Sequence, residues 1–301
     1  MMDELEKDIL RTIVWFSLSE YPLTAFEIWK WMFEPARTYT LRDVVQTLSA
    51  SKELLRYVHE EDGTYTLREG TASVSLRRKR FSDALRKMTR ARRVMRYVRC
   101  IPFVRGVGVC NTLSWMHTRS ESDIDFFIMV REGSLWITRL LVVLPFKVLR
   151  ARPGERKEDP LCFSFFLSDT SLNLEALALA PKDPYLAYWI ASVLPLFDRD
   201  GVFSAFQKAN TWVNKTLSNA YTREAIGEDR KTRQASEWFE RCASRLQRRA
   251  FPETITQMAN RDSRVVVSDA MLKFHANDRR EQFRDRYQTL CEIYGLSSLD
   301  A

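Results

Sequence analysis

The stretch Val104–Val130, VRGVGVCNTLSWMHTRSESDIDFFIMV, decides the fold that the sequence predicts. Its pattern indicates a strand, a polar turn with a short helical segment, and a second strand that opens with two aspartates. Because successive side chains of a strand point to opposite faces, Asp123 and Asp125 share one face, and the apolar residues between and after them share the other. We therefore expect two carboxylates side by side at the solvent end of a buried strand.

Two neighbouring carboxylates repel each other unless a cation or a set of hydrogen-bond donors neutralises them. A hard cation such as Mg²⁺ binds one or two carboxylates and completes its coordination shell with water and substrate phosphates. The pair Asp123 and Asp125 therefore predicts a metal site for phosphate chemistry. The alternative is a solvated turn or a helix N-terminus, where aspartate is favourable without any ligand.

This stretch resembles the DNA-polymerase-β-like nucleotidyltransferase superfamily, in which a Gly-Ser turn after one strand precedes Asp-x-Asp at the start of the next. Here Asp123 and Asp125 follow Ser122, and Asn111 and Thr112 take the place of Gly-Ser. The resemblance implies that the two aspartates hold Mg²⁺ and that Asn111, Thr112 and Ser122 position the phosphates of a nucleoside triphosphate. Asparagine tolerates the left-handed backbone that glycine supplies, and Thr112 keeps a hydroxyl, so such a turn can still hold phosphate.

Many active members of that superfamily carry a third carboxylate on a neighbouring strand. The neighbouring strand expected here, Leu161–Leu167, contains no acid, and its alternation offers Ser164 instead. Asp169 follows this strand and is a candidate for the missing acid.

Two functional hypotheses stay open. One is a Mg²⁺-dependent enzyme that transfers a nucleoside monophosphate to a nucleic acid or protein. The other is a degenerate relative that binds nucleotide or nucleic acid without chemistry. A toxin–antitoxin component is a third, by analogy with the superfamily alone.

Residues 1–70 predict a winged helix-turn-helix domain. Helical spacing of apolar residues marks residues 4–18, a second helix over Ala25–Phe33 with Thr24 as its N-cap, and a third helix after Thr40. Asp62-Gly63 between two β-prone runs then predicts a hairpin. The third helix carries both signs of charge and the hairpin tip is acidic, which is poor chemistry for a phosphate-lined groove. Packing or protein contact is therefore favoured over DNA binding.

Residues 71–99 are expected to form a basic linker, and Asp83 is its one acidic residue. Apolar residues at helical spacing predict an amphipathic helix with an almost purely positive outer face. An unmixed positive face favours contact with a nucleic-acid backbone, although an acidic protein partner is an alternative. The arginines expected at this contact are Arg78, Arg86, Arg90 and Arg93.

Residues 100–220 are expected to form the nucleotidyltransferase-like domain, a small mixed sheet with covering helices, one of which is expected over Val202–Leu217. Residues 221–235 are polar and predict a linker, and residues 221–301 as a whole predict a mostly helical region. Its last element is expected to be a helix over Ala270–Tyr294, on which the cluster from Lys273 to Arg280 is a candidate second phosphate site. The chain is also similar over most of its length to bacterial nucleotidyltransferase-like proteins, which supports this α+β layout.

Composition agrees with a folded protein that has an acidic partner. The chain of 301 residues is 45% hydrophobic, with a net charge of +8, and such a charge favours nucleic acid, nucleotide or anionic membrane. The five cysteines are dispersed, which predicts free thiols in a reducing cytoplasm and no zinc site. The most apolar run, Leu135–Phe146, is too short to cross a membrane. Base preference, acceptor and oligomeric state stay open.

Overall fold

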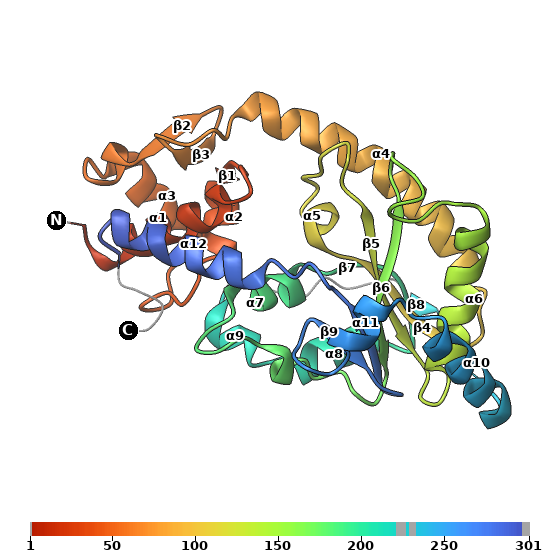
Figure 1. The fold of residues 1–301 in the computed structure, drawn as a ribbon. Coiled ribbons are helices and arrows are strands. Elements are labelled where there is room, and N and C mark those ends of the chain that lie inside the picture. Colours follow the sequence, from red (N-terminus) through yellow and green to blue (C-terminus); the bar gives the residue numbers. More distant parts are fainter. Residues whose placement is uncertain (1, 221–226, 229–232, 297–301) are drawn as a thin grey trace.

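The computed structural model describes residues 2–220, 227–228 and 233–296 of a mixed α+β protein. Two open sheets, one of three strands and one of seven, are surrounded by helices (Figure 1). The large sheet has the strand order β8-β7-β4-β5-β6-β10-β9. Its strands are β4 (Val104–Val109), β5 (Ile124–Val130), β6 (Leu161–Ser168), β7 (Leu194–Arg199), β8 (Gly227–Glu228), β9 (Val265–Val267) and β10 (Met271–Phe274).

The strand directions in the large sheet determine which chain segments meet at each of its ends. Strand β5 is antiparallel to β4 and parallel to β6, and the register pairs Asp125 with Cys162. The beginnings of β5 and β6 therefore lie at the same end of the sheet, next to the end of β4. The polar turn after β4 and the two aspartates at the start of β5 meet there.

The two faces of the large sheet are covered by different helices. One face packs against α4 (Val74–Val98), α6 (Leu135–Val148) and α10 (Glu237–Arg249), through apolar residues that include Phe126 and Ile128. The other face, which holds Phe127 and Met129, packs against α7 (Pro184–Ser192) and α8 (Val202–Ala209). Asp125 is two positions before Phe127 on β5, so its side chain lies on the same face, the α7 side of the sheet.

Two glycines of β4 allow α8 to pack closely on the sheet. A Cβ atom at Gly106 would lie 2.8 Å from Val202 Cγ1, and one at Gly108 would lie 3.1 Å from Phe203 Cζ. Close packing between this strand and α8 thus explains why glycine occupies positions 106 and 108.

The N-terminal part of the chain contains three helices and the small sheet, whose strand order is β1-β3-β2. Capping boxes at Thr24 and Thr40 start its second and third helices, and Asp62 and Gly63 have the positive φ angles of a tight hairpin turn. Its elements are α1 (Glu4–Ser17), β1 (Leu23–Thr24), α2 (Ala25–Lys30), α3 (Leu41–Ala50), the 3₁₀ turn η1 (Leu54–Arg56), β2 (Val58–Glu61) and β3 (Thr64–Leu67).

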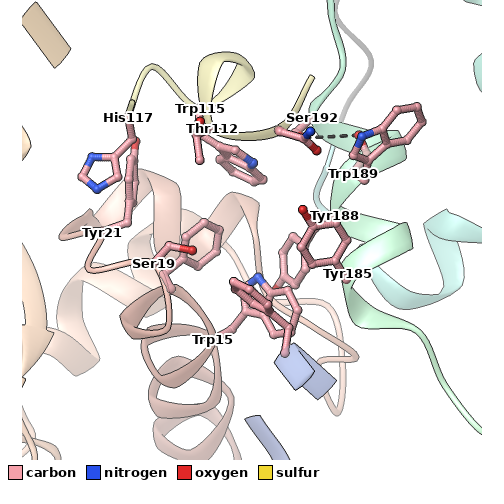
Figure 2. A pocket seen from close by; sticks show the side chains of 13 residues that line it. Trp15, Ser19, Tyr21, Thr112, Trp115, His117, Tyr185, Tyr188, Trp189 and Ser192 are labelled. Atoms are coloured by element: carbon pink, nitrogen blue, oxygen red, sulfur yellow. Dashed lines mark hydrogen bonds between the residues drawn. The ribbon is translucent and has the colours of Figure 1, made fainter. Parts of the chain in front are cut away.

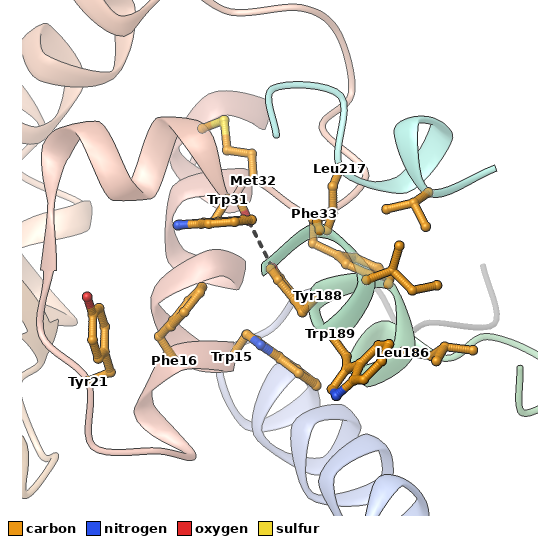
Figure 3. Close-up of a cluster of buried hydrophobic side chains, with 14 of the residues drawn as sticks. Trp15, Phe16, Tyr21, Trp31, Met32, Phe33, Leu186, Tyr188, Trp189 and Leu217 are labelled. Carbon is orange, nitrogen blue, oxygen red and sulfur yellow. Dashed lines mark hydrogen bonds between the residues drawn. The ribbon is translucent and has the colours of Figure 1, made fainter. Parts of the chain in front are cut away.

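A single aromatic core joins this N-terminal part to the large sheet and to the last helix (Figure 3). The Trp15 ring of α1 stacks on Tyr188 of α7 with the centroids 4.9 Å apart, and it meets Tyr287 edge-on at 5.2 Å. Tyr287 belongs to α12 (Arg280–Ile293), which lies beside α1 in Figure 1. The Tyr188 hydroxyl donates a 2.9 Å hydrogen bond to the carbonyl oxygen of Trp31. Elements from both ends of the sequence therefore share one hydrophobic core.

The C-terminal part differs from the long helix expected over Ala270–Tyr294. Residues Met271–Phe274 form β10, which pairs with β6 and β9, and α12 begins only at Arg280. The Ser268 hydroxyl accepts hydrogen bonds from the backbone of Ala270 and Met271, which closes the β9–β10 turn. A short apolar run does not by itself distinguish strand from helix, and here pairing with the sheet edge decides.

Other predicted helices are shorter than expected, and one strand was missed. The helix expected over Val202–Leu217 is divided into α8 and α9 (Val213–Thr216) around Asn210, whose side chain bonds to three backbone groups of neighbouring segments. The helix expected over Ala25–Phe33 ends at Lys30. The strand that was missed is β7, which directly follows α7. The remaining short elements are η2 (Glu175–Leu177) and α11 (Glu253–Met258). Among the described residues, no helix is both long enough and apolar enough to span a bilayer.

Candidate metal and nucleotide site

Two aspartates and a cysteine converge where β5 and β6 begin. Asp123 immediately precedes β5, Asp125 is its second residue, and Cys162 is the second residue of β6. The carboxylate oxygens and the thiol sulfur of these residues lie within 4.8 Å of one another. The arrangement follows from the two-residue period of a strand and from the parallel pairing of β5 with β6. Three ligand-type atoms within this distance can face one cation.

The two carboxylates carry a negative charge that the fold only partly compensates. Burial raises the pKa of Asp125, and burial together with the charge of Asp125 raises the pKa of Asp123. A hydrogen bond of 2.9 Å from Asn111 Nδ2 to Asp125 Oδ2 and the nearby Lys87 ammonium act in the opposite direction. A bound cation would stabilise the ionised pair further, because an opposite charge favours the charged form.

The turn after β4 has the conformation that its residue types suggested. Asn111 has a φ angle of +55°, in the left-handed region that glycine adopts most easily and asparagine tolerates. Its side chain bonds to Asp125, and the adjacent backbone N–H of Cys110 donates to the carbonyl oxygen of Asp125 at 3.2 Å. Thr112 is exposed beside it. Asn111 thus supplies both the turn conformation and a direct link to the acidic pair.

Ser122 lies in the loop that leads into Asp123, and a lysine that the sequence analysis did not single out holds this loop. The Lys87 ammonium is fully buried and donates to the carbonyl oxygens of Ser122 at 2.7 Å, Ser120 at 3.3 Å, and Arg119. The Ser122 hydroxyl accepts a 3.2 Å bond from the backbone N–H of Arg119. Ser122 therefore shapes the loop, with its oxygen atoms already bonded inside it.

The sequence did contain a signal for Lys87. This residue lies three positions after Ala84 and four before Ala91, both fully buried, so it belongs to the inward stripe of α4 and not to the basic outer face. An isolated lysine at such a position must find partners inside the protein. Its ammonium also pairs with Asp83 at 3.2 Å and with Asp159 at 3.8 Å.

The residue of β6 that lies beside the acidic pair is Cys162, and not Ser164 as the sequence alternation suggested. The two residues are two positions apart on β6. The strand register brings Cys162 beside Asp125. The hydroxyl of Ser164 instead lies 3.0 Å from His275 Nε2. Burial and the neighbouring Asp125 charge raise the pKa of the Cys162 thiol well above its ordinary value. The thiol is therefore protonated at neutral pH and is a weaker ligand than a third carboxylate.

Asp169 lies at the opposite end of the sheet from Asp123 and Asp125. It accepts a hydrogen bond of 2.8 Å from Arg105 Nη1, and Arg131 lies 3.4 Å away. Because β5 and β6 are parallel, a residue that follows β6 is separated from the beginning of β5 by the length of a strand. The hypothesis that Asp169 supplies the third carboxylate is wrong for this reason.

The four arginines expected at a nucleic-acid contact lie along α4 with different surroundings. Arg78 is exposed and pairs with Asp62 at 3.0 Å, whereas Arg86 pairs with both Asp83 and Asp159. Arg90 is half-buried, and burial followed by the charges of Arg156 and Arg86 lowers its pKa. The exposed Arg93 lines a groove of about 430 Å³ between α4 and β7, together with Arg92 and Arg96.

In the second phosphate site expected between Lys273 and Arg280, these two cations are engaged in buried ion pairs. Lys273 Nζ lies 3.4 Å from Asp278, and Arg280 bonds to both Asp278 and Asp183 at 2.9 Å. The pKa of His275 falls to about 3 through burial and the Lys273 charge, so this imidazole is neutral at pH 7. These residues lie on β10 and around the start of α12, where they connect the sheet edge to α7.

Comparison with known proteins gave no relative: no family model, curated protein or solved structure matches the chain.

Proposed function

We propose that this protein is a Mg²⁺-dependent nucleotidyltransferase that moves a nucleoside monophosphate from a nucleoside triphosphate to an acceptor, a nucleic acid or a protein. The supporting observation is the convergence of Asp123, Asp125 and Cys162 beside the Asn111–Thr112 turn. Two carboxylates fit a hard divalent ion that leaves positions for water and phosphate oxygens. When bound, Mg²⁺ would neutralise the charge that develops on the transferred phosphoryl group.

The protein's own residues would prepare the substrate for an in-line displacement. Asp123 and Asp125 would hold the metal, while the Asn111 backbone and the Thr112 hydroxyl would hold the phosphates. Lys87 would fix the 119–122 loop and thereby the position of Asp123. Since Cys162, the third residue of the cluster, is a protonated thiol, the acceptor hydroxyl would lose its proton to water or to the substrate. Slow turnover is the expected consequence.

The N-terminal part, residues 1–70, would be a winged helix-turn-helix used for packing. Its element order and its sheet order β1-β3-β2 support this assignment. The third helix, α3, mixes charges, and the β2–β3 turn carries Glu61 and Asp62. Nucleic acid, where it is the acceptor, would instead contact α4 through Arg78, Arg86, Arg90 and Arg93.

The test is transfer of labelled nucleotide by a variant that has lost the acidic pair. The protein would be incubated with each α-labelled nucleoside triphosphate, Mg²⁺, and mixed RNA, DNA and protein acceptors. Labelling should disappear in the Asp123→Asn/Asp125→Asn double variant and persist in the matched Asp262→Asn/Asp285→Asn double variant, whose carboxylates are exposed elsewhere. Undiminished labelling in the first variant would refute the mechanism.

A second candidate function is nucleotide binding without chemistry, and Cys162 is the observation that favours it. A thiol is a softer ligand than a carboxylate and suits Mg²⁺ less well. Calorimetry with each nucleoside triphosphate, with and without Mg²⁺, distinguishes the two candidates in combination with the labelling experiment. Metal-dependent binding without any labelled product would identify the binding protein.

A further inference from the structure

Three neighbouring arginines of α4, Arg92, Arg93 and Arg96, line the groove between this helix and β7. All three side chains are exposed, and their guanidinium groups form no hydrogen bond or ion pair with the described residues. The remaining described residues that line the groove, none of them acidic, are Thr89, Met95, Pro195 and Leu196. The groove of about 430 Å³ therefore carries a positive charge that the described part of the chain does not compensate.

Two arginines in the first half of α4, by contrast, have acidic neighbours. Arg78 pairs with Asp62 at 3.0 Å, and Arg86 pairs with Asp83. The cavity of about 500 Å³ between this half of the helix and the 118–121 loop is lined by Asp83 and Glu121 as well as by cations. A polyanion would meet these carboxylates there, and charges of the same sign repel each other. The second half of α4 is therefore the better electrostatic match for a polyanion.

The three guanidinium groups are spaced for a row of anions. Arg92 and Arg96 are four residues apart, so they lie about 6 Å from each other on the same side of the helix, and Arg93 lies beside them. Two positive charges at this spacing destabilise a helix unless an anion compensates them. A guanidinium group binds the oxygens of a phosphate with two parallel hydrogen bonds. The ligand that suits this groove therefore carries several phosphate groups in succession.

A nucleic-acid strand supplies phosphates in such a row. It carries one negative charge for about each 3.4 Å of helix axis, whereas a protein partner carries its acidic side chains among neutral ones. The described lining of the groove contains no aromatic side chain on which a base could stack. Contact in the groove would therefore be with phosphate and sugar, and it would not depend on the base sequence.

The groove begins at the end of the large sheet that holds the candidate site. In the register of β7 with β4, Pro195 lies beside Gly108. Gly108 precedes Asn111 by three residues, so their Cα atoms are at most about 11 Å apart. Successive phosphates of one strand advance about 3.4 Å along a helix axis. A strand bound in the groove would therefore reach the Asn111–Thr112 turn within a few nucleotides.

The aromatic pocket beside this turn offers no such positive charge. Figure 2 shows the pocket, of about 110 Å³, with Thr112 and Trp115 on one side and Trp15 and Tyr188 on the other. Among its described lining residues there is no lysine or arginine, and burial followed by the charge of Arg80 lowers the pKa of His117 to about 4, so this imidazole is neutral at pH 7. A phosphate backbone would therefore approach the turn along the arginine groove.

We infer that the groove lined by Arg92, Arg93 and Arg96 binds the sugar–phosphate backbone of a nucleic acid, and that this nucleic acid is the acceptor of the transferred nucleotide. Backbone binding depends on the groove alone. The role as acceptor rests on the proposed function and deepens it, because it selects nucleic acid over protein. Arg93 was among the residues expected at such a contact, whereas Arg92 and Arg96 were not.

Binding is tested by fluorescence anisotropy of the full chain with labelled RNA and DNA strands of mixed sequence and with labelled poly-glutamate, without nucleotide or Mg²⁺. The nucleic acids should bind more tightly than poly-glutamate, and the logarithm of the binding constant should fall linearly with the logarithm of the salt concentration. Absence of nucleic-acid binding, or tighter binding of poly-glutamate, would overturn the inference and leave the proposed transfer to a protein acceptor standing.

A triple variant locates the contact. Arg92→Gln/Arg93→Gln/Arg96→Gln should reduce the magnitude of this salt slope by about 2 to 3, because each lost phosphate contact contributes about 0.7 to 0.9. Arg92→Lys/Arg93→Lys/Arg96→Lys keeps the charges and should retain the slope, since lysine also binds phosphate. Loss of the slope in the lysine variant as well would show that the positive charges do not make the contact and would refute the inference.

The matched control removes the same net charge from another surface. Arg245→Gln/Arg249→Gln/Arg286→Gln replaces three exposed arginines of α10 and α12. It should change the salt slope by less than about 1, the contribution of one phosphate contact. Circular dichroism establishes that each variant is folded. Equal reductions of the slope in the two glutamine variants would show that net charge alone matters and would refute binding in the groove.

The role as acceptor is tested by transfer of label from α-labelled nucleoside triphosphates in the presence of Mg²⁺. The groove variant with three glutamines should need at least about tenfold more RNA or DNA for half-maximal labelling, with an unchanged requirement for nucleoside triphosphate. Label found only on protein, or an unchanged requirement for nucleic acid, would refute the acceptor role. Absence of label on every acceptor would overturn the proposed function itself, whereas the anisotropy experiment still decides whether the groove binds nucleic acid.

Discussion

The buried ammonium of Lys87 lies 2.7 Å from the carbonyl oxygen of Ser122, the residue that precedes the first aspartate of the acidic pair. Helix α4 is therefore connected directly to the loop that places Asp123. Because the same ammonium pairs with Asp83 and Asp159, a single side chain joins the helix, the loop and the segment before β6. A helix that looks like a basic surface element thus also supports the candidate site from inside.

Replacing this lysine should cost stability and disorder the loop. In Lys87→Met the methylene chain is retained, but two carboxylates and the loop carbonyl groups lose their buried cation. We expect the free energy of unfolding to fall by about 3–5 kcal/mol, the usual cost of breaking a buried ion pair. Urea denaturation measures it, with Lys79→Met on the exposed side of the same helix as control. Equal stability of the two variants would show that Lys87 does not hold the loop.

Asn111 should be replaceable by glycine at a lower conformational cost than by alanine. Its φ angle of +55° is unfavourable for residues with a Cβ by about 1–2 kcal/mol, whereas glycine adopts it freely. Both replacements remove the hydrogen bond to Asp125, so their difference isolates the backbone contribution. We expect Asn111→Ala to unfold at lower urea concentration than Asn111→Gly. The reverse order would argue against a left-handed residue in this turn.

A third carboxylate introduced at Cys162 should strengthen metal binding. In Cys162→Asp the new side chain faces Asp125 across the β5–β6 pair, and without metal its charge adds to a repelling cluster. Stabilisation by Mg²⁺ is about 2.7 kcal/mol at a concentration about 100 times the dissociation constant. In thermal unfolding with increasing Mg²⁺, the melting temperature should therefore begin to rise at a lower concentration in Cys162→Asp than in Cys162→Ser. No Mg²⁺ dependence in either variant would argue against a cation at this position.

Stability should decrease on mild acidification, partly because of His117. This imidazole is 3% exposed, and burial followed by the charge of Arg80 lowers its pKa from 6.5 to about 4. Between pH 6.5 and 4 the unfolded chain binds a proton that the folded protein does not, so stability falls as the pH falls. From pH 6.5 to pH 5 the loss is up to about 2 kcal/mol, at about 1.4 kcal/mol for each pKa unit.

Urea denaturation of His117→Asn at pH 7 and pH 5 tests this contribution. The difference in unfolding free energy between the two pH values should be smaller in this variant than in the unmodified protein. His59→Asn, on strand β2 where the side chain is exposed, is the matched control and should leave the difference unchanged. An identical pH dependence in His117→Asn and the unmodified protein would contradict the low pKa.

The elements that the sequence predicted well are those whose signals are local. The β4–turn–β5 segment, the N-cap of Thr24 and the tight turn at Asp62 and Gly63 depend on residues a few positions apart. Strand β10 and the break at Asn210 depend on partners far along the chain, namely β6 and the backbone of Leu172. Local periodicity contains no information about such partners, which explains why helices were expected in both places.

The sequence by itself determined that Asp123 and Asp125 project from the same face of a strand and that Asn111 occupies a turn, because the two-residue period and backbone preferences are local properties. Only the tertiary structure decided that Cys162 completes the acidic cluster, that Asp169 lies at the far end of the sheet and that the ammonium of Lys87 bonds to the 119–122 loop. Strand register and helix docking decided these positions, and both depend on the burial of apolar surface by segments distant in sequence.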